Sequence, residues 1–222
     1  MAEPTPKELF DLGMHNYDKQ DFSKARKYFE RACGLNNGRG CNNLGVLYRD
    51  GQGVEKNLTK AAQFYSKACD LNNGSGCNNL GDLYQNGEGI EKNLTKAAQF
   101  YSKACDLNNG SGCSTLGFLY GSGEGVKQDS KKAVALYEKS CDLNNGSGCF
   151  NLGELYFEKD SKKAVALFEK SCDLNISRGC GALGVLYYNG QGVEKDLIKA
   201  AQYISKACKL GDQKACEALK EK

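Results

Sequence analysis

Several features are scarce in this sequence, and each scarcity excludes a class of protein. The 222 residues include one histidine, His15. They contain no apolar run approaching the roughly 18 residues that a membrane-spanning helix needs. The 30 basic and 27 acidic residues give a net charge of +3, which provides no strong attraction for nucleic acid or a membrane surface. We therefore expect no membrane span and no nucleic-acid partner.

Proline is confined to the first six residues, at Pro4 and Pro6. We interpret residues 1–6 as a tail and expect a helix to begin near Pro6, because proline fits the first turn of a helix. The N-terminus has no secretory signal pattern, so we expect a mature form, or one to which Met1 was added.

A repeated segment organises the chain. The stretch KNLTKAAQFYSKACDLNNGSGC occurs twice, letter for letter, at Lys56–Cys77 and Lys92–Cys113. Looser copies end at four further cysteines, Cys41, Cys149, Cys180 and Cys216. A period of about 36 residues is typical of a stacked array in which each repeat contacts only its neighbours. The expected boundaries are 7–36, 37–72, 73–108, 109–144, a short repeat at 145–175, 176–211, and a capping helix at 212–222.

All twelve cysteines occur in pairs eight positions apart. Zinc is the alternative to disulfides, but a single histidine and C-x7-C spacing do not fit zinc sites. The turn L-N-N-G-[SR]-G lies between the members of a pair, so each pair is expected to link consecutive helices. Since disulfides persist outside the reducing cytoplasm, we predict a secreted or periplasmic protein. The predicted pairs are Cys33–Cys41, Cys69–Cys77, Cys105–Cys113, Cys141–Cys149, Cys172–Cys180 and Cys208–Cys216.

Each repeat predicts two helices. The first, called helix A, carries C-x-x-L-G-x-L-Y, whose apolar positions mark one helical face. Its glycine, as at Gly81, is expected to let the second helix approach closely. That second helix, called helix B, follows an Asn or Asp N-cap twelve residues before a cysteine. In the third copy its buried stripe is expected to comprise Leu94, Ala97, Ala98, Tyr101, Ala104 and Cys105.

Two kinds of connection join these helices. The G-x-G-[VI]-x-K loop, as in Gly51–Lys56, is interpreted as a helix–helix turn, because no strand precedes it and the Lys-Ser/Thr of a phosphate-binding loop is missing. In the turn between repeats, the Asn-Gly pair is suited to the left-handed conformation that ends a helix. Ser75, Ser111 and Ser147 are placed in this turn. The short repeat lacks five loop residues, and its helix A is expected to continue through Tyr156–Lys159 directly to Asp160.

These motifs resemble known repeat families. The segment from Leu12 to Cys33 resembles a tetratricopeptide repeat, and the longer repeats resemble Sel1-like repeats. The C-x7-C of each repeat and the start at Ala2–Leu9 are similar to the Helicobacter cysteine-rich protein (Hcp) family over essentially the whole chain. This resemblance implies an all-α fold, a right-handed α/α superhelix of Sel1-like repeats joined by disulfides. It also implies secretion, interaction with host cells, and penicillin binding with weak β-lactamase activity.

No catalytic motif for that activity stands in the sequence. The S-x-x-K, S-D-N and K-T-G motifs of serine β-lactamases are absent. A metallo-enzyme needs several histidines, and His15 is interpreted as an ordinary surface or packing residue. We expect no metal and no cofactor, and we assign no catalytic residue. A penicillin-binding protein or slow β-lactamase remains the alternative function.

A binding surface has more support. Helix A lines the concave face of tetratricopeptide arrays, and its positions two, five and eight after the cysteine vary between otherwise similar repeats. An asparagine both donates and accepts hydrogen bonds, so a ladder of them can hold an extended peptide backbone. The alternative is that these residues form merely solvated helix faces. We predict a monomeric scaffold that binds an extended peptide or a host protein at Asn43, Asn79, Asn151, Arg49, Asp82 and Glu154.

Overall fold

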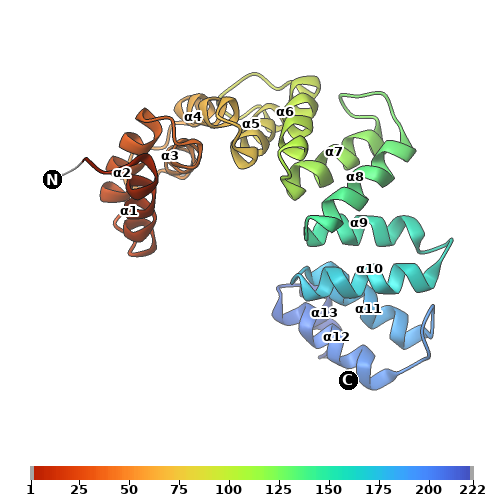
Figure 1. Cartoon of the computed structure of the whole chain (residues 1–222). Helices are drawn as coiled ribbons and strands as arrows, with labels where there is room; N and C mark the ends of the chain where they lie inside the picture. The colour runs from red at the N-terminus through yellow and green to blue at the C-terminus, as the bar shows by residue number, and fades with distance from the viewer. Residues whose placement is uncertain (1–2, 221–222) are drawn as a thin grey trace. The chain divides into compact units, whose positions relative to one another are not determined.

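The computed structural model describes residues 3–220, and this part of the chain forms thirteen α-helices and no strand (Figure 1). The all-α prediction is confirmed. The helix A elements are α1 (Pro6–Asp18), α3 (Gly38–Asp50), α5 (Gly74–Asn86), α7 (Gly110–Ser122), α9 (Gly146–Tyr156) and α11 (Ser177–Asn189). The helix B elements are α2 (Phe22–Gly34), α4 (Leu58–Asp70), α6 (Leu94–Asp106), α8 (Ser130–Asp142), α10 (Ser161–Asp173) and α12 (Leu197–Lys209). The chain continues into α13 (Gln213–Ala218), and the last two residues of the expected capping helix lie outside the described range.

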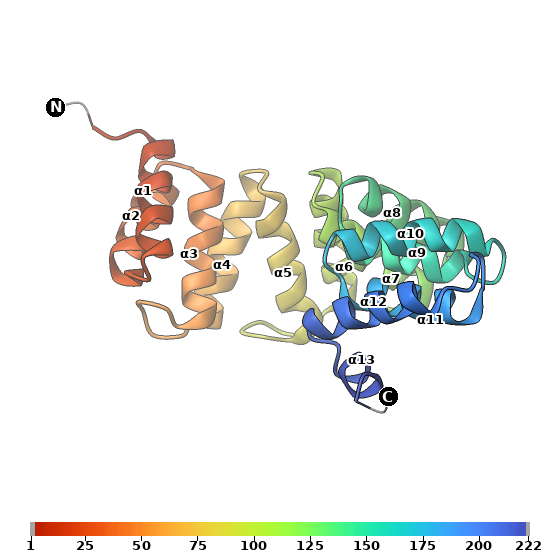
Figure 2. The same cartoon turned by 90° about the horizontal axis from the view of Figure 1, so that it is seen from below.

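The helices form two compact units. Unit 1 comprises residues up to 112 together with 123–128, and unit 2 comprises 113–122 together with residues from 129 onward. In unit 1, α1 packs against α2, α3 against α4 and α5 against α6. In unit 2, α9 packs against α10 and α11 against α12. These pairs lie side by side in both views (Figures 1 and 2). None of the described helices is long and apolar enough to cross a bilayer.

The helix B elements begin at the Asn and Asp N-caps that the sequence predicts. The Asn57 side chain accepts a hydrogen bond from the Lys60 amide at 2.9 Å, which satisfies a backbone donor that has no partner within the helix. The same cap occurs at Asp21, Asn93, Asp129, Asp160 and Asp196.

The turn between repeats differs from the sequence expectation. Its left-handed residue is the first asparagine, Asn72 at φ 57°, which precedes the Asn73-Gly74 pair that was expected to adopt this conformation. The second asparagine, Asn73, caps helix A by accepting from the Gly76 amide at 2.8 Å. Helix A therefore begins before its cysteine, and the serines placed in the turn lie in the first turn of a helix instead, at Ser75, Ser111 and Ser147.

Close contact between paired helices explains the helix A glycine. A Cβ atom added at Gly81 on α5 would lie 2.7 Å from Cε1 of Tyr101 on α6, which is closer than such atoms approach. The aromatic ring thus occupies the volume that a side chain at Gly81 would need. Most of the predicted α6 stripe is buried, whereas Leu94 is only half-buried.

Within each unit, disulfides join the end of a helix B to the start of the next helix A, as predicted. The Cα atoms of Cys69 and Cys77, for example, lie 4.5 Å apart. Cys105 and Cys113 are also disulfide-bonded, and none of the described cysteines is free. The other bonds within the two units are Cys33–Cys41, Cys141–Cys149, Cys172–Cys180 and Cys208–Cys216.

The short repeat departs from its expected course. Its helix A, α9, ends at Tyr156 and does not continue to Asp160. The amides of Lys159 and Asp160 both bond to the Tyr156 carbonyl, at 3.0 and 2.7 Å, and Asp160 has φ −151°. The expectation of a continuous helix was wrong because α9 and α10 pack side by side, and the chain must reverse direction between them.

Candidate functional site

The predicted asparagine ladder links neighbouring helix A elements. In unit 1, Nδ2 of Asn79 donates to Oδ1 of Asn42 at 2.8 Å, which joins α5 to α3. Nδ2 of Asn43 lies 3.0 Å from Sδ of Met14 on α1. These amides therefore have a structural role on the helix A face.

The equivalent link in unit 2 is longer. Nδ2 of Asn151 on α9 donates to Oγ of Ser114 on α7 at 3.4 Å. Asn151 stands two residues after its helix A cysteine, as Asn79 does in unit 1. Ser114 stands one residue after its cysteine, as Asn42 does. The asparagine two positions after the cysteine thus reaches the preceding helix A in both units.

A polar cluster lies on the helix A face of unit 1. The Tyr101 hydroxyl lies 2.7 Å from Oδ1 of Asp82 and 2.6 Å from Oε1 of Gln85. The predicted binding residues Arg49 and Asp82 interact electrostatically here, although the closest ionic partner of Arg49 is Asp50, with Nε to Oδ1 at 2.7 Å. The structure therefore brings Arg49 and Asp82 into one charged cluster.

Burial has the largest effect on the pKa of Asp82 and on that of Tyr65. Loss of solvent raises the pKa of Asp82, against the opposing effects of the Tyr101 hydrogen bond and of Arg49. Loss of solvent likewise raises the pKa of Tyr65 to about 12. The Tyr65 hydroxyl is buried and has no hydrogen-bond partner within residues 3–220.

We expect the Asp82→Asn variant to be more stable than the wild type at neutral pH, and this difference to vanish in acid. The folded pKa of Asp82 is raised, so the folded state binds more protons than the unfolded chain between the two pKa values. The stability contributed by Asp82 is complete below the unfolded pKa, about 3.9. It is lost as the pH rises through the folded pKa. Urea unfolding of both proteins across this pH window measures the difference.

The Tyr101→Phe variant provides a control for the direction of this effect. It removes a hydrogen bond that lowers the pKa of Asp82, so the pH-dependent window should widen toward higher pH. A stability difference between Asp82→Asn and wild type that stays constant with pH would contradict the assignment to Asp82 ionisation.

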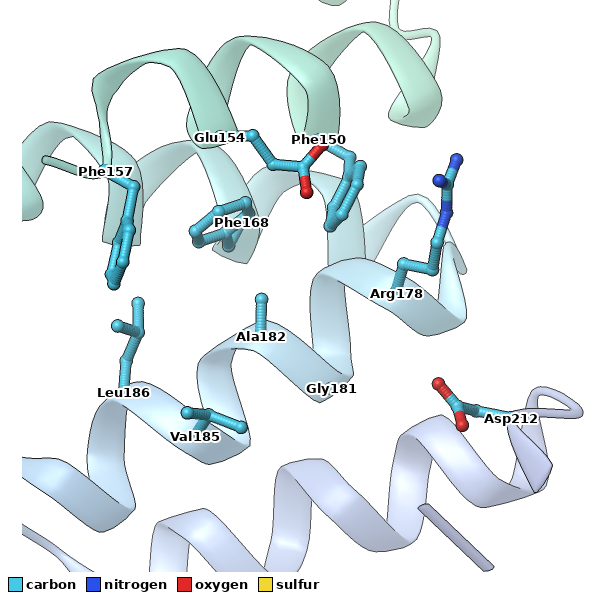
Figure 3. A pocket seen from close by; sticks show the side chains of 10 residues that line it. All are labelled: Phe150, Glu154, Phe157, Phe168, Arg178, Gly181, Ala182, Val185, Leu186 and Asp212. Atoms are coloured by element: carbon cyan, nitrogen blue, oxygen red, sulfur yellow. The ribbon is translucent and has the colours of Figure 1, made fainter. Parts of the chain in front are cut away.

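Unit 2 contains an apolar pocket of about 470 Å³ between α9 and α11 (Figure 3). Phe157 and Val185 are partly exposed at the pocket, whereas Leu186 is buried beneath it. Figure 3 shows Phe150, Phe157 and Phe168 on the side of the pocket opposite α11. The rings of Phe150 and Phe168 lie 5.6 Å apart. The pocket therefore has a largely aromatic wall.

Charged groups lie beside this aromatic wall. The Arg178 guanidinium lies over the Phe150 ring, 4.5 Å from its centroid. The predicted residue Glu154 also lines the pocket, and its carboxylate lies beside Phe150 in Figure 3. Asp212 caps α13 through the Ala215 amide at 3.0 Å. Its Oδ2 lies 3.6 Å from where a Cβ at Gly181 would stand.

The pocket opens where α11 carries two small residues. Gly181 and Ala182 follow the helix A cysteine, at positions held by Asn42 and Asn43 in α3. Ala182 has no amide with which to bridge to the preceding helix A, as Asn79 does in unit 1. A pair of asparagines is thus replaced by open space beside Phe150.

Sequence reasoning found only part of this site. It selected Glu154 and recognised the variable positions of Phe157 and Val185, but it missed Arg178, Phe150 and Asp212. Arg178 stands two residues before the cysteine, where three other repeats have serine and one has Arg39. This alternation between serine and arginine was the available signal.

Residues considered for catalysis are not assembled at this pocket. His15 is exposed on α1, in the other unit. Within the described range there is no cluster of three His, Cys, Asp or Glu residues arranged to hold a metal.

Paired helices, regular N-caps and interhelix disulfides define a class of protein, the disulfide-linked α-helical repeat arrays. The model of the Sel1 repeat matches six consecutive segments, at residues 9–37, 38–73, 74–109, 111–145, 146–176 and 177–212. The chain therefore belongs to the Sel1 repeat family.

The resemblance to Helicobacter cysteine-rich proteins is found over a limited stretch. A segment of 58 residues is 62% identical to a protein named putative beta-lactamase HcpC from Helicobacter pylori strain J99. Another 58-residue match is 52% identical to beta-lactamase HcpA of the same strain. Each match covers 26% of this chain, and they span 20% and 23% of those relatives. The chain thus spans about a fifth of the length of the curated relatives that it matches.

Solved structures agree on the fold over most of the chain. A Sel1 repeat protein from Oxalobacter formigenes is 28% identical, with a TM-score of 0.86 over 93% of this chain and 86% of that one. The protective antigen c5321 of uropathogenic Escherichia coli, described as displaying an SLR fold, is 25% identical with a TM-score of 0.79. That match covers 95% of this chain and 47% of the antigen.

Proposed function

We propose that this protein is an exported scaffold that binds an extended segment of a partner protein through the helix A face of unit 2. The observation that carries this proposal is the pocket beside Gly181 and Ala182, whose volume of about 470 Å³ suits a large side chain. Its aromatic wall favours an aromatic or long aliphatic residue. Disulfides are typical of proteins outside the reducing cytoplasm, which supports export.

The charged groups beside the pocket indicate which residues flank the apolar residue in the partner's segment. The Arg178 guanidinium offers N–H donors in a fork that matches a carboxylate. The carboxylates of Glu154 and Asp212 offer acceptors for the amide N–H groups of an extended backbone. The best ligand is therefore a peptide with a large apolar residue near an acidic one. Asn151, on the same helix as Glu154, extends this polar surface.

Binding is expected to fail when the pocket is filled. The Ala182→Leu variant places a larger side chain in the open space. It should weaken the binding of a fluorescent peptide of this type at least tenfold. Loss of the cation in Arg178→Gln should weaken the binding of acidic peptides more than the binding of neutral ones. Fluorescence anisotropy with the oxidised protein measures both effects.

Ile198→Ser serves as a matched control, because Ile198 is 74% exposed on α12 and does not line this pocket. It should bind like the wild type. If peptides bind Ala182→Leu and wild type equally, the pocket is not the binding site. The asparagine links are tested separately with Asn43→Ala and Asn79→Ala, which should alter binding only if unit 1 also contacts the peptide.

β-Lactam binding or slow hydrolysis is the second candidate function, and it is favoured by the names of the HcpC and HcpA relatives. A penicillin combines a carboxylate with an apolar side chain, which fits the chemistry of Arg178 beside Phe150. However, the pocket lining includes no serine, cysteine, lysine or histidine to act as a nucleophile. Binding without efficient turnover is therefore the form of this activity that the site supports.

A chromogenic cephalosporin separates the two candidates. Steady turnover that co-purifies with the protein and falls in Arg178→Gln would favour the β-lactamase. Turnover that purifies away, alongside saturable peptide binding, would favour the scaffold.

A further inference from the structure

The glycine-rich loop of each full-length repeat covers the first turn of the preceding helix B. Gly53 lies against the backbone of Phe22 on α2, and Gly89 lies against Leu58 on α4. The carbonyl of Gly89 accepts a hydrogen bond from Thr59 Oγ1 at 3.3 Å. Gly125 and Gly192 make the equivalent contacts to α6 and α10, at Leu94 and Ser161.

The aliphatic residue after the second glycine completes this cover. Val54 and Ile90 pack against the core cluster of unit 1, and Val193 packs against a core cluster of unit 2. The loop therefore contributes one β-branched side chain to the core and brings a glycine backbone into contact with the helix below.

Helix α8 lacks this cover, because the short repeat that follows has no such loop. The consequence is visible at Leu155 on α9, which is 45% exposed. Its equivalents in four other repeats are at most 2% exposed, at Leu47, Leu83, Leu119 and Leu186. A position that belongs to the core elsewhere is open to solvent here.

A second pocket, of about 590 Å³, is lined by Ser130, the first residue of α8, which is equivalent to the residues that the loop contacts at Leu58 and Ser161. Ala133 and Val134 of α8, together with Leu155, supply its aliphatic surface. The exposed ring of Phe118 on α7 also lines it. This pocket shares no lining residue with the one beside Ala182.

We propose that this second pocket binds a loop of a partner protein with the form Gly-x-Gly-Val/Ile-Glu, which supplies between molecules the loop that the short repeat omits. The occupant is defined by what fills the same position in the other repeats. A β-branched side chain enters the aliphatic surface, and glycines allow the partner's backbone to lie directly on the first turn of α8.

Charge complementarity favours an acidic residue after the aliphatic one. Lys159 lines the pocket, and the Lys163 ammonium lies 3.7 Å from the centroid of the Tyr156 ring, which also lines it. In three of the chain's own loops a glutamate follows the aliphatic residue, at Glu55, Glu91 and Glu194. A partner loop with the same order places its carboxylate near these two ammonium groups.

The test uses a backbone-cyclised peptide containing Gly-Gln-Gly-Val-Glu-Lys, the sequence of residues 51–56. Titration calorimetry and NMR of the oxidised full-length protein should show saturable binding, with shifts at Val134, Leu155 and Tyr156. Replacing valine by serine in the peptide should weaken binding at least tenfold. Leu155→Ser in the protein should weaken it by a similar factor.

The decisive variant restores the missing loop by inserting Gly-Gln-Gly-Val-Glu between Glu158 and Lys159. It should abolish peptide binding, because the pocket is then filled from within the chain. A control insertion of Gly-Gln-Gly-Ser-Glu adds the same length without the aliphatic side chain and should retain part of the binding. Ala182→Leu, which fills the other pocket, should leave this binding unchanged, so failure of the proposed function is distinguished from failure of this inference.

Three outcomes would overturn the proposal. One is the absence of saturable binding up to the solubility limit of the peptide, and another is equal binding by the loop-restored variant. The third is a dimer in sedimentation analysis that dissociates when the loop is restored, which would mean that a second copy of the chain, and not a partner protein, fills the pocket.

Discussion

Removing the Cys69–Cys77 bridge is expected to lower the free energy of unfolding by roughly 2.5 kcal/mol. The bond closes a sequence separation of only eight residues, so the chain-entropy model assigns it a modest value compared with a long-range bridge. Its effect is nevertheless large for a repeat array, whose stability is a sum of repeat and interface contributions. The double variant Cys69→Ala/Cys77→Ala tests this by urea unfolding.

Reduction of every bridge should have a much larger effect. Twelve cysteines with none free among the described residues correspond to six bonds. Six contributions of roughly 2.5 kcal/mol equal or exceed the total stability of a typical domain, about 5–15 kcal/mol. We therefore expect the fully reduced protein to lose cooperative helical structure at room temperature, as measured by circular dichroism.

The wild type treated with a thiol-blocking reagent without reductant is the control, and it should be unchanged because the described cysteines are all bonded. A reduced protein with the same unfolding midpoint as the oxidised one would show that the helix pairs are held by packing alone.

The features that were predicted from the sequence depend on short stretches of chain. An N-cap such as Asn57 is set by its own side chain and an amide three residues away, so a local motif identifies it. The Cys69–Cys77 bond is similarly local, because a short turn brings both residues together. Repetition of each motif in the chain strengthened these predictions.

The turn between repeats shows where local patterns are insufficient. Asparagine and glycine both accept the left-handed conformation, and the sequence favoured the Asn-Gly pair, Asn73-Gly74, over the asparagine that precedes it. The structure assigns the left-handed conformation to Asn72, since Asn73 must be extended to cap α5. Asn72 is left-handed because Asn73 accepts the hydrogen bond from the Gly76 amide, and the sequence pattern alone did not predict that bond.

The two pockets depend on differences between repeats. The pocket beside Ala182 forms because small residues replace a pair of asparagines, and the pocket at Leu155 forms because a loop is missing. The residues that line both pockets are of types that are common in cores and on surfaces. Their exposure depends on how the neighbouring helices pack, so the sequence alone did not predict it.

A single added methyl group at Gly81 is expected to destabilise unit 1 by about 1–3 kcal/mol, although alanine is intrinsically better in helices. In Gly81→Ala the new Cβ would lie 2.7 Å from Tyr101 Cε1, and the ring has little room to move. Tyr101 is fully buried, and its hydroxyl lies within hydrogen-bond distance of both Asp82 and Gln85. Displacing the ring therefore separates α5 from α6 and disturbs the polar cluster on the helix A face.

Gly34→Ala makes the same chemical change where the structure has space. Gly34 is the last residue of α2, and no atom beyond its chain neighbours and the adjoining helix backbone lies within 4 Å of its added Cβ. This variant should be neutral or up to about 1 kcal/mol more stable, because alanine restricts the unfolded chain. Equal unfolding midpoints for Gly81→Ala and Gly34→Ala would mean that the contact with Tyr101 does not limit how closely the helices pack. Opposite shifts would show that close approach, and not backbone freedom, explains a glycine on helix A.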